Sequence, residues 1–301
     1  MKIVVVGSSN TDMIVKVPRI PKPGETILGG KFSTAAGGKG ANQAVAAARA
    51  GGDVTFIARV GDDMFGQQAY SGFKEDQINV GYVKTDKVEP SGVALIFVDE
   101  KGENSIAVAS GANAALSPED VNEAAELIQS ADILLMQLET PLETVRRAAE
   151  IAKEAGVKVI LNPAPAMKLD DSFLSNLTII TPNESEAELL TGISVTDVES
   201  AERAAIALLE RGLEVVIITL GSKGALIKTK EKKHLIAGFK VDAVDATAAG
   251  DVFNGSLAVA IAEGKSQEDA VRFANAAAAL SVTKLGAQPS IPKRDEIERL
   301  L

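Results

Sequence analysis

Residues 133–161, Ile-Leu-Leu-Met-Gln-Leu-Glu-Thr-Pro-Leu-Glu-Thr-Val-Arg-Arg-Ala-Ala-Glu-Ile-Ala-Lys-Glu-Ala-Gly-Val-Lys-Val-Ile-Leu, predict a strand, a helix and a second strand. The apolar runs 133–138 and 157–161 are short enough for buried strands, and helix-forming residues separate them. Further apolar runs at 3–6, 54–60 and 215–220 alternate with helical segments in the same way. Strands alternating with helices indicate an α/β fold with a doubly wound, mainly parallel sheet flanked by helices.

Residues 92–110 follow a different pattern. Val93, Leu95 and Phe97 alternate with other residues, a polar turn follows, and Ile106 and Val108 alternate again. A hairpin with one polar face does not suit a buried parallel sheet. We therefore expect a single domain over residues 1–301, with a small β-sheet lid formed by about 12–34 and 92–110.

Three boundary predictions accompany this fold. Ser117 is expected to cap one helix that continues to Gln129. Residues 224–228 and 235–241 resume a strand pattern, which indicates an antiparallel edge of the sheet. The single histidine, His234, lies between them among lysines and is expected in a solvated loop.

Composition excludes several functions. The chain has no cysteine and one histidine, so thiolate catalysis, disulfides and multi-histidine metal sites are ruled out. A net charge of −10 argues against general nucleic-acid binding. No run is long enough for a membrane span, and the N-terminus begins a strand without a signal-peptide pattern. We expect a cytoplasmic protein that binds neither nucleic acid nor membrane.

Residues 245–255, Asp-Ala-Thr-Ala-Ala-Gly-Asp-Val-Phe-Asn-Gly, precede an apolar helix. The small residues Ala248, Ala249 and Gly250 allow backbone amides to surround an anion at the positive end of that helix. Asp251 adds a carboxylate to the same place. Taken alone, an Asp in this position is more often an ordinary N-cap.

Polar side chains also follow the predicted strands, where ligands bind in open α/β sheets. They are Asn10, Asp12, Glu139, Asn162, Asn183 and the stretch from Thr219 to Gly224. Asn, Asp and Glu side chains that converge on a cleft suit a polyhydroxylated ligand, although each alone could be a turn or cap residue. The glycine-rich segment 38–42, Gly-Lys-Gly-Ala-Asn, permits close backbone approach to a ligand but matches neither a Walker nor a dinucleotide pattern.

Several of these segments together resemble the ribokinase-type carbohydrate kinase family. Residues 37–43 and 245–251 are similar to its two signatures, 181–186 to its Asn-x-x-Glu motif, and 219–224 to its nucleotide-side glycine turn. The stretches 10–12, 137–139 and 284–290 also match, and the resemblance covers essentially the whole chain in order. It implies ATP-dependent phosphorylation of a sugar, in the first place D-ribose at O5. A kinase for another sugar or a nucleoside, such as fructose or adenosine, or a non-catalytic sugar-binding protein, remains the alternative.

The resemblance also implies residue roles. Asp251 would take the proton from the sugar hydroxyl, and the amides of Ala248, Ala249, Gly250 and Asp251 would hold the developing charge. The sugar would contact Asn10, Asp12, Gly38, Lys39, Gly40, Asn42, Glu139 and Asp251. The nucleotide would contact Asn183, Thr219, Gly221, Ser222, Gly224, Gly250 and Asn275.

Two cations belong to the same expectation. Glu186 would help to place Mg²⁺, through water molecules. A monovalent cation, K⁺, would bind in a loop contributed by Asp245, Thr247, Ser281, Lys284, Gly286 and Ser290, largely through backbone carbonyls. Ala246 departs from the family, which usually has Thr, Ser or Pro there, so a hydroxyl that could brace this loop is missing. The resemblance finally implies a homodimer in which the lids pack together.

Overall fold

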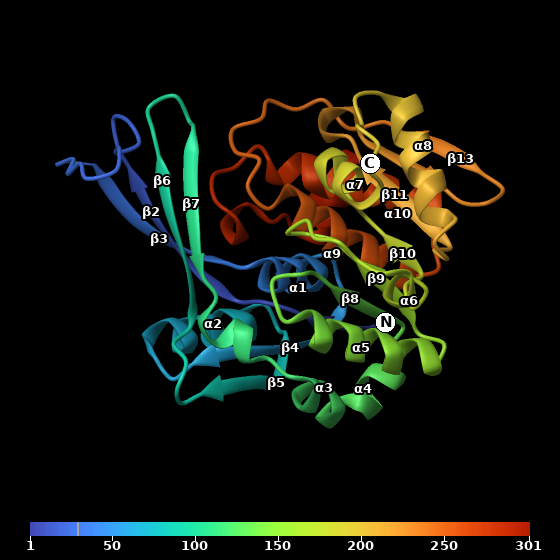
Figure 1. Ribbon diagram of the computed structural model, residues 1–301, viewed down its shortest axis with the longest axis horizontal. Coiled ribbons are helices and arrows are strands. Elements are labelled where there is room, and N and C mark those ends of the chain that lie inside the picture. The colour runs from blue at the N-terminus through green and yellow to red at the C-terminus, as the bar shows by residue number, and fades with distance from the viewer. Residues whose placement is uncertain (29) are drawn as a thin grey trace.

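The computed structural model of the chain describes residues 1–28 and 30–301, which form a large helix-flanked sheet and a smaller separate sheet (Figure 1). The large sheet has the strand order β13-β12-β11-β10-β9-β8-β1-β4-β5. Its strands are β1 (Lys2–Val6), β4 (Asp53–Gly61), β5 (Asn79–Asp86), β8 (Ile133–Met136), β9 (Lys158–Leu161), β10 (Ile179–Ile180), β11 (Val215–Thr219), β12 (Ala225–Lys228) and β13 (Lys233–Ile236). All neighbours from β11 to β5 pair in parallel, while β12 and β13 add an antiparallel edge.

Helices cover both faces of the large sheet, which explains why its central strands are continuous apolar runs. In β1, Ile3 and Val5 pack into one core and Val4 and Val6 into the other. The first core is covered by α1 (Lys39–Arg49), α2 (Met64–Glu75), α9 (Ala249–Ala262), α10 (Gln267–Ser281) and α11 (Arg294–Leu300). The second is covered by α3 (Pro118–Glu123), α4 (Ala125–Gln129), α5 (Leu142–Glu154), α6 (Asp171–Leu174), α7 (Glu184–Thr191) and α8 (Val198–Leu209).

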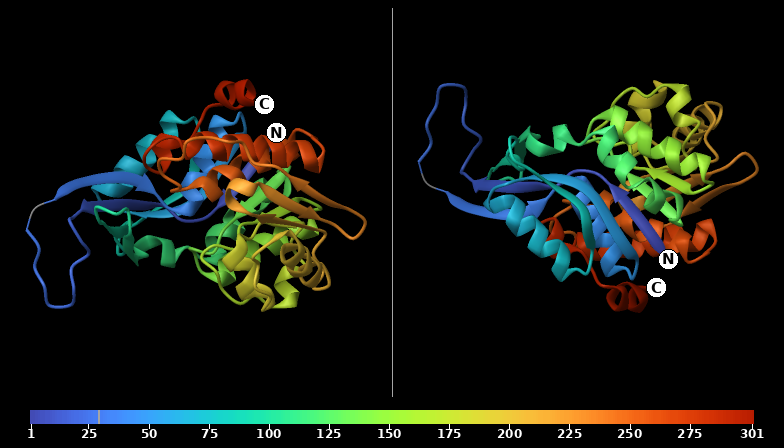
Figure 2. Two further views of the ribbon diagram at one scale, coloured as in Figure 1. Left: turned by 90° about the horizontal axis from the view of Figure 1, so that it is seen from above. Right: turned by 90° about the horizontal axis from the view of Figure 1, so that it is seen from below.

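The small sheet stands beside the helical body, at the left of Figure 1. Its strands are β3 (Lys31–Gly37), β2 (Asn10–Lys16), β6 (Gly92–Val98) and β7 (Asn104–Ala109), in that order. The chain after β2 extends away from the large sheet before it returns as β3 (Figure 2). We call these four strands the lid. Its first two strands reach beyond the expected segment 12–34, because their pairing starts at Asn10 and ends at Gly37, whereas β6 and β7 lie within 92–110.

The fold class predicted from the sequence is confirmed, and so is the antiparallel edge. The single helix expected from Ser117 to Gln129 is wrong: the chain forms α3 and α4, and Ala124 between them leaves helical geometry at φ −98° and ψ 11°. Both short helices pack on α5, so tertiary contact sets the break.

The two edge strands of the large sheet also differ from the sequence prediction. His234 lies in β13 rather than in a loop, and its Nε2 is 3.2 Å from Glu268. Strand β5 was not predicted, because polar residues such as Asn79, Lys84 and Thr85 interrupt its apolar pattern. Among the residues described, none of the helices combines the length and the hydropathy required to span a membrane.

Candidate active site

The carboxyl ends of strands β8 to β11 meet the N-termini of α1 and α9 at one edge of the large sheet. Asp251, in the first turn of α9, lies at this meeting point, and its exposed fraction is 5%. The sugar-side and nucleotide-side residues expected from the sequence come from separate strands and helices around it. The polar groups of the chain are therefore concentrated at the carboxyl ends of the parallel strands.

Two side-chain amides from α1 hold the Asp251 carboxylate. Asn42 Nδ2 donates to Oδ2 and Gln43 Nε2 donates to Oδ1, both at 3.0 Å. Burial raises the pKa of Asp251, whereas the Lys39 ammonium and these two donors favour its ionised form. The carboxylate is thus a buried acceptor whose orientation is defined by the protein.

The start of α9 is the anion cradle predicted from the sequence. Ala248 adopts a left-handed conformation with φ 61° and ψ 9°, which turns the chain into the helix. The Ala249 amide donates to Ala246 O at 3.2 Å, so it is already engaged. In the described chain the amides of Gly250 and Asp251 make no hydrogen bond to protein, as expected for a first helical turn. Of the four amides in the predicted anion cradle, only that of Ala249 is engaged within residues 1–28 and 30–301, and the amide of Ala248 is open as well.

A residue missed from the sequence braces this turn. Asn254, which is 1% exposed, donates from Nδ2 to Gly250 O at 2.8 Å and accepts from Thr181 Oγ1 at 2.6 Å. Thr181 lies directly before the Asn183 motif. The start of α9 is therefore connected through one buried amide to the end of β10.

Glycines bring α1 close to the strand that leads into the lid. Gly38 has φ 88°, and a Cβ there would lie 2.7 Å from Asn10 N. A Cβ on Gly40 would lie 2.4 Å from Ser8 N. Both contacts are with backbone, so no side chain fits at either position. This approach allows the Lys39 amide to donate to Glu139 Oε2 at 2.9 Å.

The sugar-side carboxylates are close enough to influence one another. Burial raises the pKa of Asp12 to about 6, and the charges of Glu139 and Asp251 add to the effect. Burial alone would lower the pKa of Lys39, but Asp251, Glu139 and Glu186 raise it above its ordinary value. Lys39 thus stands between the sugar-side and nucleotide-side acids and offsets their repulsion.

Two further residues that sequence reasoning missed support this side. Ser8 Oγ donates to Glu139 Oε2 at 2.5 Å. Asn113 is 2% exposed, and its side chain accepts a hydrogen bond from Ser9 N at 2.8 Å. It also donates to Asn10 Oδ1 at 2.8 Å, so the amino group of Asn10 points away from Asn113. Gly92 makes room for this pair, because a Cβ there would lie 2.2 Å from both side chains. The sequence held no signal for Asn113, which is 103 residues from its partner.

The lid presents one face to this site. Asp12 pairs with Ala35 and Ala94, and Ala94 pairs with Val108, so these residues lie on the same face as Ile106. Ile106 and Val108 are 54% and 53% exposed. Ala94 and Ile106 therefore lie on the same face of the lid as Asp12.

The nucleotide-side residues gather at the ends of β10 and β11. Asn183 and Glu186 form a reciprocal capping box at the start of α7, with distances of 2.9 and 2.8 Å. Gly224 has φ 99°, and a Cβ there would lie 2.0 Å from Ile236 O, so the glycine turn after Thr219 requires it. Asn275, on α10, donates to the carbonyls of Ile236 and Ala237 across this turn.

The loop expected to hold a monovalent cation is braced by Asp245. Its Oδ1 accepts from Thr247 N and Oγ1 at 2.9 and 2.6 Å, and its Oδ2 accepts from Gly286 N at 2.8 Å. Burial would raise the pKa of Asp245, but these bonds hold it below its ordinary value. The carboxylate joins two loop segments and has no free oxygen aimed elsewhere.

The remaining residues of this predicted loop do not direct their side chains into a common site. Ser281 Oγ donates to Ala278 O, and Ser290 Oγ donates to Ala287 O. Lys284 Nζ pairs with Glu296 at 3.1 Å. Contacts of these residues with a cation would therefore come largely from backbone carbonyls, which is also what the resemblance implies.

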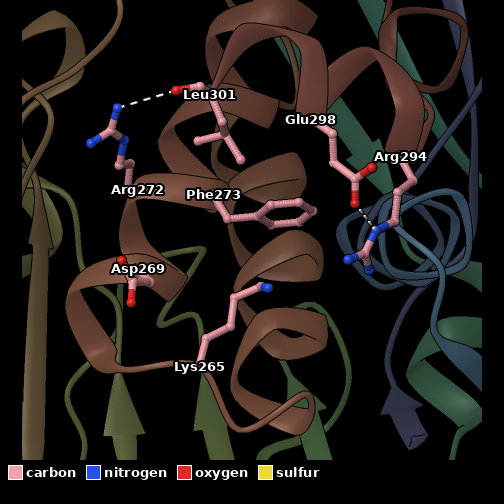
Figure 3. A pocket seen from close by; sticks show the side chains of 7 residues that line it. All are labelled: Lys265, Asp269, Arg272, Phe273, Arg294, Glu298 and Leu301. Atoms are coloured by element: carbon pink, nitrogen blue, oxygen red, sulfur yellow. Dashed lines mark hydrogen bonds and ion pairs between the residues drawn. The ribbon is translucent and has the colours of Figure 1, made fainter.

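A separate hollow of about 440 Å³ lies between the first half of α10 and α11, away from Asp251 (Figure 3). Arg294 at its rim donates to Glu298 at 2.7 Å, and Arg272 donates to the Leu301 carbonyl. Its other charged lining residues are Lys265 and Asp269. None of the residues predicted for the site lines it, so it is not the candidate site.

A buried carboxylate beside open helix-terminal amides, next to the lid, suits phosphoryl transfer to a hydroxylated small molecule. The comparisons agree with this class. The chain belongs to the pfkB family of carbohydrate kinases, whose profile matches residues 1–294. This confirms the family resemblance found in the sequence.

Named relatives cover nearly the whole chain. It is 52% identical over 292 residues to a ribokinase of Haemophilus influenzae, and the matched region covers 97% of this chain and 95% of that protein. It is 41% identical over 302 residues to a deoxyribokinase of Salmonella typhi, across 100% and 99% of the two chains. A solved structure of Arabidopsis thaliana ribokinase complexed with ribose and ATP has a TM-score of 0.92 at 36% identity, and covers 99% and 97%.

Asp12 provides a test of the site's electrostatics. A carboxyl with a folded pKa of about 6 and a reference value of 3.8 binds its proton more tightly in the folded state. Its contribution to stability is therefore lost as pH rises from about 4 to 6. Asp12→Asn should raise the free energy of unfolding by about 1–3 kcal/mol at pH 8, after allowance for partial exposure.

Urea denaturation at pH 8 and pH 4 measures this effect, with the exposed Asp62→Asn as the control. The gain should disappear at pH 4. An Asp12→Asn protein no more stable than the wild type at pH 8 would contradict the electrostatic description.

Proposed function

We propose that this chain is an ATP-dependent kinase that converts D-ribose to D-ribose 5-phosphate. The observation that carries the proposal is the position of Asp251, buried between the sugar-side acids and the open amides at the start of α9. The named ribokinase relatives and the ribose and ATP complex of the Arabidopsis protein support ribose and ATP as the two substrates.

The sugar is bound by polar groups that approach it from several sides. The carboxylates of Asp12 and Glu139 accept hydrogen bonds from hydroxyls, and Asn10, Lys39 and Asn42 donate or accept around them. Gly38 and Gly40 expose backbone at the same place. The apolar residues of the lid's inner face exclude water when they cover the ring.

Asp251 acts as the general base of the transfer. Its carboxylate accepts the proton of the primary hydroxyl as that oxygen forms a bond to the γ-phosphorus of ATP and the bond to the ADP oxygen breaks. The amides of Gly250 and Asp251, with the positive end of α9, stabilise the charge on the transferred group, assisted by those of Ala248 and Ala249. Positioning of the reactants and stabilisation of charge account for most of the catalysis of phosphoryl transfer.

The nucleotide occupies the side formed by β10, β11 and α10. Asn183, Thr219, Gly221, Ser222 and Gly224 line its path. Asn275 fixes the loop that closes it, through its bonds to the carbonyls of Ile236 and Ala237.

Mg²⁺ fits this site only through water and phosphate oxygens. No group of three acidic, histidine or cysteine side chains suited to a metal exists within residues 1–28 and 30–301. Glu186 has one oxygen in its capping box and the other available, which suits a water-mediated contact. When bound, Mg²⁺ would neutralise charge on the phosphates.

A monovalent cation fits the loop behind the start of α9. Asp245 joins residues 245–247 to Gly286, so carbonyls from both segments are held together. Thr247, Ser281, Lys284 and Ser290 would contribute such carbonyls. The bonds from Thr247 to Asp245 brace this loop without the hydroxyl that Ala246 lacks.

The whole chain is proposed to act as one α/β domain bearing the lid, and to form a homodimer through the lid's outer face. Val15 pairs with Phe32 and Phe97 on the face opposite Asp12, and Leu95 lies beside them. Phe32 and Leu95 are 64% and 49% exposed. Packing two such faces would remove this apolar surface from water. The cytoplasmic location stays a prediction from the sequence.

The activity is tested by ADP release over a panel of D-ribose, 2-deoxyribose, fructose and adenosine. Ribose should give the highest kcat/KM, and Asp251→Asn should lower kcat about 10²–10⁴-fold because the general base is lost. Asp62→Asn is the control. Release with none of the acceptors would refute the kinase, whereas a better acceptor than ribose would refute only the choice of sugar.

The cation loop is tested by replacing K⁺ with tetramethylammonium, which is too large for a ring of carbonyls. Activity should fall severalfold, because the start of α9 loses the support behind it. Asp245→Asn should reduce the response to K⁺. Equal activity in the two salts would contradict the cation site.

The dimer is tested by light scattering of the wild type and Leu95→Glu. We expect twice the chain mass for the wild type and the monomer mass for the variant, since a buried charge opposes association. A monomeric wild type would exclude the lid interface.

A further inference from the structure

Three buried side-chain amides form one hydrogen-bonded set with Asp251. Gln43, Gln137 and Asn162 are 0%, 1% and 6% exposed. Gln137 Nε2 donates to Gln43 Oε1 at 2.7 Å, and Gln43 Nε2 donates to Asn162 Oδ1 and to Asp251 Oδ1, each at 3.0 Å. The set forms a chain of hydrogen bonds that ends on the carboxylate.

The pattern determines which way the Gln43 amide points. Both of its N–H groups are used, one by Asn162 and one by Asp251, and its oxygen accepts from Gln137. A flipped amide would place its oxygen against two acceptors and its amino group against another amino group. In a buried site such a mismatch is costly, so Gln43 must act as a donor to Asp251.

Gln137 is placed by the backbone next to it. A Cβ on Gly7 would lie 2.1 Å from Gln137 Oε1, so the end of β1 leaves room for this side chain only because residue 7 is glycine. Gln137 Oε1 itself is buried and has no partner in the described chain. The chain therefore accepts one unsatisfied oxygen to keep the donor on Gln43.

The Gln43 donor matters because the other groups around Asp251 have opposing effects on its charge. Burial and the nearby Glu139 disfavour its charge, and Lys39 with Asn42 favours it. Asp12 and Glu186 also face it as like charges. A glutamine does not titrate, so its contribution is the same at every working pH.

We propose that Gln43 is a positioning residue that keeps Asp251 ionised and aimed at the substrate hydroxyl, and that Gln137 holds Gln43 in the donating orientation. This inference rests on the proposed function of Asp251 as a base. Without the Gln43 donor, the carboxylate would retain Asn42 as its only amide partner. It would then bind a proton at a pH where the wild type is ionised.

The test is the pH profile of kcat and of kcat/KM for Gln43→Met, a variant of similar length without a donor. The acidic limb should move up by about one to two pH units, the amount expected for one hydrogen bond to a charge. On the linear part of the acidic limb kcat should fall about tenfold or more, raising the pH should restore it, and KM for the sugar should change less. Gln129→Met, at an exposed glutamine, is the matched control.

Gln137→Met supplies a second reading, since it leaves Asp251 untouched but frees the Gln43 amide to rotate. We expect a shift in the same direction and smaller, and this variant decides the matter should Gln43→Met fail to fold. A loss of activity that is equal at every pH in the folded variants would mean a merely structural role and would overturn the proposal. Absence of ADP release from the wild type is a different result, which refutes the proposed function and the inference with it.

Discussion

The site depends on one constraint: a carboxylate is almost fully buried beside other acids, where burial disfavours its charge. Asp251 lies at the start of α9, where helix amides favour negative charge and where the transferred phosphoryl group is expected. Like charges from Asp12 and Glu139 stand nearby. Three groups of the protein favour the charge of Asp251: the Lys39 ammonium and the side-chain amides of Asn42 and Gln43.

That constraint explains why α1 and α9 are packed so closely. A Cβ on Gly255 in α9 would lie 2.5 Å from Gln43 O, so the two helices touch through backbone. Close packing brings the α1 amides onto the α9 carboxylate. Missing side chains also allow close approach at Gly38 and Gly92, where lid strands meet the main body, and at Gly40, where α1 meets the backbone of Ser8.

The lid connects to the same group of residues. Asn10 begins β2 and is held by Asn113, while Asp12, two residues later, already lies on the inner face of the lid. One short strand, β2, therefore carries both Asn10, which is fixed to the main body, and Asp12, which belongs to the lid. Movement of the lid would displace Asp12 relative to Glu139 and Asp251, and so change the electrostatic balance that raises the pKa of Asp12.

The sequence by itself determined the alternation of strands and helices, the separate hairpin and the motif residues from Asn10 to Asp251, because local periodicity and glycine placement are properties of neighbouring residues. Tertiary structure alone decided the break at Ala124, the polar edge strand β5 and the pairing of Asn113 with Asn10. It also decided the chain from Gln137 through Gln43 to Asp251, whose ends are more than a hundred residues apart. Hydrogen bonds between buried amides leave no periodic trace in a sequence, since their partners are selected by how helices and strands pack.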